Sequence, residues 1–283
     1  MGAVIQEREV RAGSFLTRYL CAGPERGAQT VLLIHDGAFG ADAGVSWSSV
    51  IPTLSARYRV LAPDLLGYGG TDKAVFLDRS PYEFRIEHLA AFCAELGVDA
   101  VHAVGSSFGG SVVLRALAGP GPRLPLLTAV SIAGTGGPGR RAERYAGLAE
   151  YDGSEADMCR VVRLMVDDYP GLRKQVRARH RNTMRPGHVE VCMAPHLAGP
   201  TTQPRQPDHW PADLARNRVP VLLVAGTRDD LLEPGWPELF DGVPHVSVRR
   251  MDCRHLPNLD RPQELAGVLI DFFQRNTGSG GIP

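Results

Sequence analysis

The sequence lacks an excess of charge of either sign and a long apolar run. Its 31 Lys and Arg residues balance 31 Asp and Glu residues, so no net field attracts the chain to nucleic acid or to an anionic membrane. A membrane-spanning helix needs a stretch of about 18 apolar residues, and the sequence contains none. The first residues carry charges at positions where a signal peptide is apolar. We therefore expect a small-molecule substrate, no nucleic-acid partner and no membrane partner.

Paired cysteines and regularly spaced histidines are also missing. The five cysteines are odd in number, widely spaced and form no C-x-x-C pair, so neither a disulfide framework nor a zinc site is predicted. The histidines show no repeated ligand spacing, and His35 and His102 are expected to hydrogen-bond the backbone beside their strands. We expect a cytoplasmic protein with reduced thiols, no metal and no cofactor. The sequence leaves the oligomeric state open, a homodimer included.

What the sequence does contain is a series of short apolar, β-branched runs separated by helical stretches. Such runs, bounded by turn residues, are typical of strands buried in a parallel sheet. A chain of 283 residues with this alternation can form one catalytic unit with an inserted subdomain. The predicted fold class is α/β, with about eight strands. They are an antiparallel hairpin at 4–11 and 14–21, then strands at 31–34, 58–62, 100–104, 127–133, 219–224 and 245–248.

Helical patterns flank and interrupt this series. Between Tyr82 and Leu96 apolar residues recur at steps of three and four, and Gly97 ends the pattern. From 136 to 211 the strand pattern disappears, and helical segments at 141–150, 154–168 and 170–184 are separated by Gly and Pro. We predict a core formed by 1–135 and 212–275, a helical lid at 136–211 and a loose tail at 276–283.

The third parallel strand runs directly into Gly105-Ser106-Ser107-Phe108-Gly109, and a helical stretch follows. This is G-x-S-x-G between a strand and a helix, the context in which it forms a nucleophile elbow. Small residues are needed beside Ser107 because a Cβ there would collide with neighbouring backbone. The helix directs its N-terminal dipole at the same place, which favours developing negative charge. An isolated match is more often a glycine-rich packing turn, but the later residues favour a nucleophile.

Several motifs in one order make the chain resemble the α/β-hydrolase superfamily along nearly its whole length. They are Leu33-Ile34-His35-Asp36-Gly37, the segment Pro63 to Asp72 with its Gly-Tyr-Gly-Gly, the elbow at Ser107, and His255 after the last strand. The resemblance implies an α/β-hydrolase fold, a mostly parallel sheet flanked by helices with an inserted lid. It also implies Ser107 as nucleophile, His255 as general base and Asp229 as the acid that orients it. The adjacent Asp230 is chemically equivalent and stays an alternative.

The resemblance extends to the oxyanion hole. It implies donors at the N–H groups of Phe108 and Gly37. The family usually has His-Gly where this chain has His35-Asp36-Gly37, so Asp36 either narrows the loop or places a charge near the site. Asp64 is expected to order its loop through Gly67 and Gly69. An aspartate nucleophile, the alternative within this fold, is contradicted by a serine at the elbow.

A narrower resemblance is to the meta-cleavage product hydrolases, which cleave carbon–carbon bonds of vinylogous diketones. It is carried by His35 to Ala41, by Ser46-Trp47 and by the elbow, and it implies substrate contacts from Phe39, Ser106, Leu256 and the lid residue Arg179. That subfamily usually has Asn at the position of Ser106 and Trp at that of Leu256. Arg179 would bind a substrate carboxylate, although its cluster with Arg173, Lys174, Arg177 and Arg181 favours a solvated helix face.

Because the residues of carbon–carbon cleavage are only partly present, we expect a hydrolase of an ester, lactone or related acyl substrate, slightly ahead of a carbon–carbon bond hydrolase of a diketone or 2-hydroxy-6-oxo-dienoate. The substrate is small and carries an anionic group if Arg179 faces it. A different class of function also stays open, since fold alone does not determine function. In that class the same scaffold binds, isomerises or cyclises a ligand without net hydrolysis.

Overall fold

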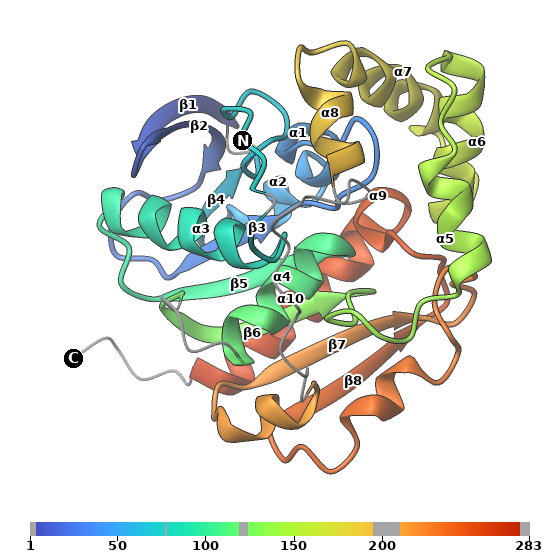
Figure 1. The fold of residues 1–283 in the computed structure, drawn as a ribbon. Helices are drawn as coiled ribbons and strands as arrows, with labels where there is room; N and C mark the ends of the chain where they lie inside the picture. Colours follow the sequence, from blue (N-terminus) through green and yellow to red (C-terminus); the bar gives the residue numbers. More distant parts are fainter. Residues whose placement is uncertain (1–3, 77, 119–123, 195–209, 278–283) are drawn as a thin grey trace.

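A central mixed sheet organises the chain in a computed structural model that describes residues 4–76, 78–118, 124–194 and 210–277. In this described part the sheet has eight strands in the order β1-β2-β4-β3-β5-β6-β7-β8 (Figure 1). β1 and β2 form an antiparallel hairpin, β2 pairs antiparallel with β4, and the remaining neighbours are parallel. The predicted α/β fold with a mostly parallel sheet is confirmed. The strands are β1 (Gln6–Ala12), β2 (Phe15–Ala22), β3 (Thr30–Ile34), β4 (Arg59–Pro63), β5 (Val101–Ser106), β6 (Leu126–Ile132), β7 (Val221–Gly226) and β8 (Val246–Met251).

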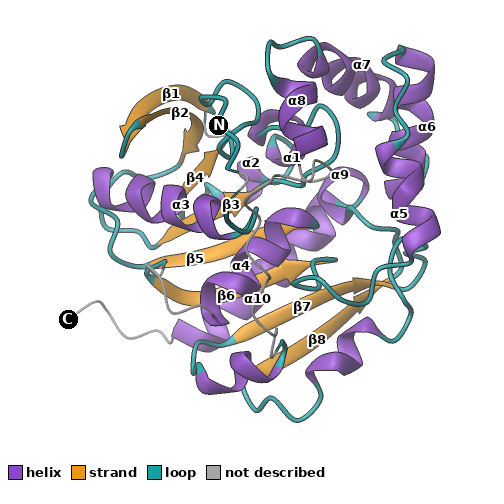
Figure 2. Cartoon of the chain, in the orientation of Figure 1, coloured by secondary structure: helices purple, strands orange, loops and turns teal. Residues whose placement is uncertain are grey.

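Helices cover both faces of the sheet, as Figure 2 shows. α3 (Glu83–Glu95) and α4 (Phe108–Ala118) pack on one face, whereas α1 (Ala43–Trp47), α2 (Ile51–Leu54) and α10 (Pro262–Thr277) pack on the other. The sequence of β3 is apolar throughout because helices cover both of its faces. Leu32 and Ile34 pack on the side of α3 and α4, and Val31 and Leu33 pack on the opposite side. Each such buried side chain contributes roughly 1.5–3 kcal/mol.

The segment between β6 and β7 is helical, as predicted. It contains α5 (Ala142–Ala149), α6 (Glu155–Met165), α7 (Leu172–Thr183) and α8 (His188–Met193), followed by the 3₁₀ helix η2 (Ala212–Arg216). α5 to α8 gather at one end of the sheet in Figure 1. Ser154 caps α6 by accepting from the N–H of Asp157. α8 was not predicted from the sequence, residues 195–209 lie outside the described part, and the exact domain boundaries stay a prediction.

Apolar side chains join this lid to the core. Met158, Val162 and Met165 of α6 form a third apolar cluster with Leu231 and Leu256, which follow β7 and β8. A further helical turn, η3 (Trp236–Phe240), precedes β8, and α9 (Pro257–Asp260) follows it. The lid therefore packs directly over the loops at the ends of the last two strands.

The predicted start of the loose tail is wrong by two residues. α10 continues through Asn276 and Thr277, whose side chains donate to the carbonyl oxygens of Phe272 and Phe273 at 2.8 and 2.7 Å. These bonds extend the last turn of the helix beyond its apolar pattern, and residues 278–283 of the predicted tail lie outside the described part. Within the described residues, no helix combines the length and the apolar character that crossing a membrane requires.

Candidate active site

The turn from β5 into α4 places Ser107 in a strained conformation. Its φ is 53°, in the left-handed region that side chains rarely adopt. The turn is tight because a Cβ on Gly105 would lie 2.1 Å from the carbonyl oxygen of Gly109, and one on Gly109 would lie 2.4 Å from that of Ile34. The N–H of Ser107 donates to Ile132 at 2.7 Å, which holds the turn against β6. The small residues of the motif are thus required by backbone contacts.

Ser107, His255 and Asp229 form a continuous hydrogen-bonded chain. The Nε2 atom of His255 lies 2.8 Å from the Ser107 Oγ, and its Nδ1 lies 2.7 Å from an Asp229 carboxylate oxygen. The side chains of His255 and Asp229 are 0% and 2% exposed. The other oxygen of Asp229 accepts from the N–H of Leu231 at 2.9 Å, so the carboxylate orientation is fixed. A neutral imidazole with its proton on Nδ1 fits both contacts.

Asp230 is placed differently from its neighbour. Its carboxylate is 52% exposed and lies 3.7 Å from the guanidinium of Arg254. The geometry therefore favours Asp229 over Asp230 as the acid beside His255.

The two residues expected to supply oxyanion donors lie against each other. A Cβ added to Gly37 would lie 2.8 Å from the Cβ of Phe108, so only glycine permits this approach. Phe108 is the first residue of α4, where N–H groups have no acceptor within the helix. The carbonyl oxygen of Gly37 accepts from the Tyr68 hydroxyl at 3.1 Å, which orients the loop. The arrangement is suited to binding an oxyanion beside Ser107.

Asp36, the residue that departs from the family pattern, is bound by Arg179 of α7. The guanidinium donates to both carboxylate oxygens at 3.1 and 2.7 Å, and both side chains are buried. Ser46 and the N–H of Ala38 donate to the same carboxylate. Burial alone would raise the pKa of Asp36, but Arg179 outweighs it and lowers the pKa to about 2.

This pair corrects the interpretation of the arginine cluster. Arg173, Lys174, Arg177 and Arg181 are exposed, but Arg179 is 0% exposed, so the solvated helix face is wrong for that residue. Arg179 also donates to the carbonyl oxygen of Phe39. Because its guanidinium faces Asp36, the arrangement does not favour the substrate-binding role predicted for Arg179.

Further polar contacts hold α7 and α8 to the same loop. The N–H of Gly40 donates to His188 Nε2 at 2.8 Å, and its carbonyl oxygen accepts from Asn182 at 3.0 Å. Burial lowers the pKa of His188 to about 4, so the ring is neutral and can accept. The lid and the loop that carries Gly37 therefore form one connected structure.

Ser106 and Leu256 are both buried and have partners within the protein. The Ser106 hydroxyl is buried and donates to Asn258 at 3.1 Å. Leu256 is 0% exposed in the lid cluster, and its N–H donates to Met165. Phe39 lies in the same cluster with its ring 5.0 Å from that of Tyr151. The substrate contacts predicted for these three residues stay predictions.

Sequence reasoning missed three residues around the elbow: Tyr82, which contacts Phe108, Tyr145, which is near Ser107, and Arg140, which contacts both tyrosines. Tyr82 stacks on Phe108 with ring centroids 5.3 Å apart. Burial raises the pKa of the Tyr145 phenol, although Arg140 and a hydrogen bond with Ser107 oppose the rise. No spacing in the sequence marked them, because Tyr82 begins one helix and the other two lie at the base of the lid.

The remaining polar predictions have mixed outcomes. His35 bonds the backbone as expected, through Asp36 and Leu65. His102 does not: its ring nitrogens contact the side chains of Thr128 and Gln29, because β3 and β5 already pair in register and use their main-chain groups. Asp64 does order its loop, and a Cβ on Gly69 would lie 2.0 Å from its carboxylate, but the main-chain donor there is Gly70.

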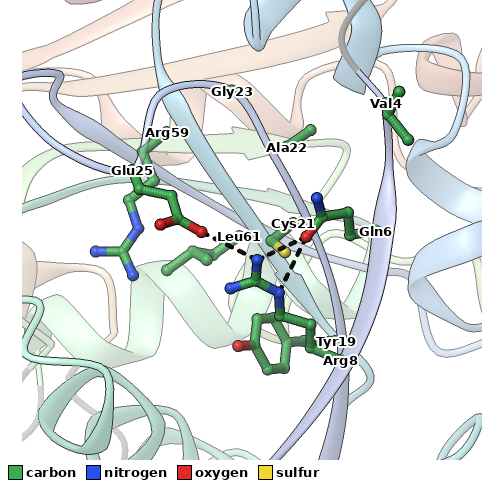
Figure 3. A pocket seen from close by; sticks show the side chains of 10 residues that line it. All are labelled: Val4, Gln6, Arg8, Tyr19, Cys21, Ala22, Gly23, Glu25, Arg59 and Leu61. Atoms are coloured by element: carbon green, nitrogen blue, oxygen red, sulfur yellow. Dashed lines mark hydrogen bonds and ion pairs between the residues drawn. The ribbon is translucent and has the colours of Figure 1, made fainter.

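A small hollow of about 70 Å³ lies beside the β1–β2 hairpin, away from Ser107. Arg8 crosses it to Gln6 and Glu25 (Figure 3). None of the predicted site residues lines it, so it takes no part in the chemistry considered below. Among the described residues there is no cluster of three or more metal-ligating side chains.

Comparisons with known proteins agree with the fold and the motif order. The model of the alpha/beta hydrolase family matches residues 31–268. The chain is 28% identical to a 2-hydroxy-6-oxo-6-(2'-aminophenyl)hexa-2,4-dienoic acid hydrolase of Metapseudomonas resinovorans, over 95% of this chain and 91% of that one. It is 39% identical to the magnesium-chelatase 30 kDa subunit of Rhodobacter capsulatus, over 89% of each.

A solved structure shows the same fold. The 2-hydroxy-6-oxo-6-phenylhexa-2,4-dienoate hydrolase from Rhodococcus sp. strain RHA1 superposes with a TM-score of 0.80 at 24% identity, over 96% of this chain and 99% of that chain. The two sequence relatives bear different names, so these similarities identify the ancestry of the chain more closely than its substrate.

Proposed function

The chain belongs to the alpha/beta hydrolase family and is a hydrolase, and on this basis we propose that it is a serine hydrolase of a small carbonyl substrate with Ser107 as nucleophile. The observation that carries the proposal is the chain of contacts from Ser107 through His255 to Asp229, at 2.8 and 2.7 Å. The series of hydrogen bonds starts at Ser107, the residue with the strained backbone of the elbow.

The proposed reaction has two steps, acylation of Ser107 and hydrolysis of the acyl-enzyme, and the same groups act in both. His255 takes the proton of the Ser107 hydroxyl while the oxygen attacks the carbonyl carbon, and Asp229 stabilises the imidazolium. The N–H groups of Phe108 and Gly37 bind the oxyanion. His255 then protonates the leaving group, which departs and leaves an acyl-enzyme. Water, deprotonated by His255, attacks the acyl carbon, and Ser107 recovers its proton as the acid product leaves.

For the bond that is broken, an ester, lactone or related acyl bond is the first candidate. Its cleavage requires only the triad and two donors. Carbon–carbon cleavage also requires a pocket that converts a dienol to a ketone while holding a planar anion. The residues that resemblance would assign to that task are occupied elsewhere: Arg179 with Asp36 and Ser106 with Asn258.

Carbon–carbon cleavage of a 2-hydroxy-6-oxo-dienoate is the second candidate, and the Metapseudomonas relative supports it. That protein is named for this reaction and aligns over 95% of the chain.

One set of assays tests both. Purified protein is given p-nitrophenyl esters and a 2-hydroxy-6-oxo-dienoate under the same conditions, and a fluorophosphonate label is mapped by peptide mass. We expect ester turnover and a label on Ser107, both lost in Ser107→Ala and retained in Ser106→Ala. A kcat/KM for the dienoate more than about 100-fold higher, about 2.7 kcal/mol in transition-state binding, would instead establish the second candidate. No turnover and no labelling would contradict a serine hydrolase and favour a binding scaffold.

A further inference from the structure

Arg140 is a half-buried cation at the base of the lid. Its backbone is held beside the loop that follows Asp229: Arg140 bridges Leu232, and the N–H of Arg141 donates to the carbonyl oxygen of Leu231 at 3.0 Å. The position of Arg140 relative to the triad is therefore determined by main-chain contacts, in the same way as that of the acid.

The surroundings of Arg140 differ from those of the other buried arginines. Arg179 binds Asp36, and Arg18 binds Asp64 at 2.8 Å. Arg85 donates to the main-chain carbonyl oxygens of Leu66 and Pro81. In the described part of the chain, Arg140 has no carboxylate within ion-pair distance, and its side chain donates to a single neutral acceptor, the Tyr82 hydroxyl at 3.0 Å. A guanidinium has five donors, so most of its binding capacity is unused.

Two tyrosines connect this cation to the reacting serine. The Arg140 guanidinium lies 4.9 Å from the ring centroid of Tyr145. The Tyr145 ring lies edge-on to His255 with the ring centroids 6.4 Å apart, and Ser107 is close enough to lower the pKa of the Tyr145 phenol. On the other side, Tyr82 stacks on Phe108. The cation is thus about one tyrosine side chain away from the nucleophile.

We propose that Arg140, framed by Tyr82 and Tyr145, binds the carboxylate of a substrate whose carbonyl carbon is attacked by Ser107. The inference rests on the proposed function and specifies its substrate class: an anionic acyl or carbonyl compound with the carboxylate at the end remote from the scissile bond. A planar guanidinium binds a carboxylate with two parallel hydrogen bonds, and partial burial strengthens them because water competes less.

The proposal also explains how the protein can bind a substrate carboxylate although Arg179 is already paired with Asp36. Arg179 is neutralised by Asp36, so a second anion there would face a pair with no net charge. A half-buried cation without a counterion is costly, and at Arg140 the substrate itself supplies the counterion. The anion site therefore lies at the base of the lid rather than on α7.

Kinetics on two matched esters test this assignment. 4-Nitrophenyl valerate and 4-nitrophenyl hydrogen glutarate have the same leaving group and acyl length, and differ in a terminal methyl or carboxylate. Arg140→Gln, which can still donate to Tyr82, should lower kcat/KM for the glutarate about 10- to 100-fold and for the valerate less than about threefold. Arg140→Lys should fall between, because it keeps the charge without the fork. Arg144→Gln, an exposed position of α5, is the matched control.

A binding measurement separates this proposal from the triad assignment. Ser107→Ala protein, which needs no turnover, is titrated calorimetrically with 5-oxohexanoate and with its uncharged amide. We expect tighter binding of the acid, with the difference abolished by Arg140→Gln. If Arg140→Gln abolishes the preference for the acid but Ser107 takes no fluorophosphonate label, the anion site is supported and the proposed function is contradicted. Equal losses on both esters, no loss on either, or an unchanged preference would overturn the role of Arg140.

Discussion

The strand-end loops and the lid hold their functional side chains by different means. Ser107, Asp229 and His255 follow β5, β7 and β8, where parallel strands end at one edge of the sheet. Main-chain hydrogen bonds set their positions, such as those from the N–H of Ser107 to Ile132 and from the N–H of Arg228 to Cys253. In the lid, α7 and α8 are held to the loop before α1 by side chains, chiefly Arg179 on Asp36 and Asn182 on Gly40.

The difference teaches where each region tolerates change. Geometry set by a sheet persists when one side chain is replaced, so a substitution among the triad residues should remove chemistry and leave stability nearly intact. Geometry set by buried polar pairs depends on both partners, so a substitution there should lower stability and affect chemistry only through position.

The largest effect is expected for Asp229→Asn. An amide cannot hold the Nδ1 proton of His255 in the required tautomer, so kcat on a p-nitrophenyl ester should fall about 10⁴-fold. The melting temperature should hardly change, because the contacts of the loop are main-chain.

Asp230→Asn is the matched control, since that carboxylate is exposed beside Arg254. An exposed pair of this kind contributes about 1 kcal/mol or less, so kcat should stay within about twofold. Equal losses for the two variants would leave the acid unassigned and would break the comparison between the regions.

The second effect is on stability and concerns Arg179→Met. It leaves the Asp36 carboxylate buried without its cation, which typically costs about 3–5 kcal/mol. The free energy of unfolding, measured in urea, should fall by that amount. kcat/KM should change equally for neutral and acidic esters, because the guanidinium faces Asp36 and not the substrate.

Two further variants sharpen this result. Arg177→Met removes an arginine of the same helix that is 67% exposed, and it should change the stability by less than about 0.5 kcal/mol. Asp36→Asn combined with Arg179→Met should recover part of the loss, because no charge is left unpaired. A selective loss on the acidic ester would instead restore the role that resemblance assigns to Arg179.

The same contrast explains what could be predicted from the sequence. The strands were found because strands covered on both faces are apolar throughout, as in Val31 to Ile34. The elbow was found because its backbone permits only small residues around Ser107. Both signals are local, so they are visible in a short window of sequence.

The lid contacts left no such signal. Asp36 and Arg179 are 143 residues apart, and an arginine that is buried looks in sequence like its exposed neighbours on α7. Tyr145 and Arg140 reach Ser107 only because the segment after β6 returns to the loop after β7. The partners of His102 were misjudged for the same reason, since Gln29 and Thr128 come from neighbouring strands and loops.

The smallest effect concerns pH and distinguishes His188 from the Asp36 pair. Burial lowers the pKa of His188 to about 4 in the folded chain, against an ordinary value of about 6.5. Between these values the unfolded chain binds the proton and the folded chain does not, so this contribution to stability is present above pH 6.5 and is lost as the pH falls toward 4. The loss is at most about 1.4 kcal/mol per pH unit. The pKa of Asp36 is about 2, so its pair with Arg179 stays ionised throughout this window.

His188→Gln isolates that contribution, because the amide oxygen can still accept from the N–H of Gly40 but does not titrate. His88 and His102 are buried elsewhere, with the pKa of each also lowered by burial to about 4, and they add the same dependence in the core. Urea unfolding at pH 7 and pH 5 should therefore show a smaller drop in His188→Gln than in the unsubstituted chain. Hydrogen exchange of the Gly40 amide at pH 5 should be slower in the variant, because the glutamine oxygen is not protonated and keeps accepting from this N–H. If the two proteins lose the same stability, the pKa of His188 is not lowered by folding and this explanation of the pH dependence is wrong.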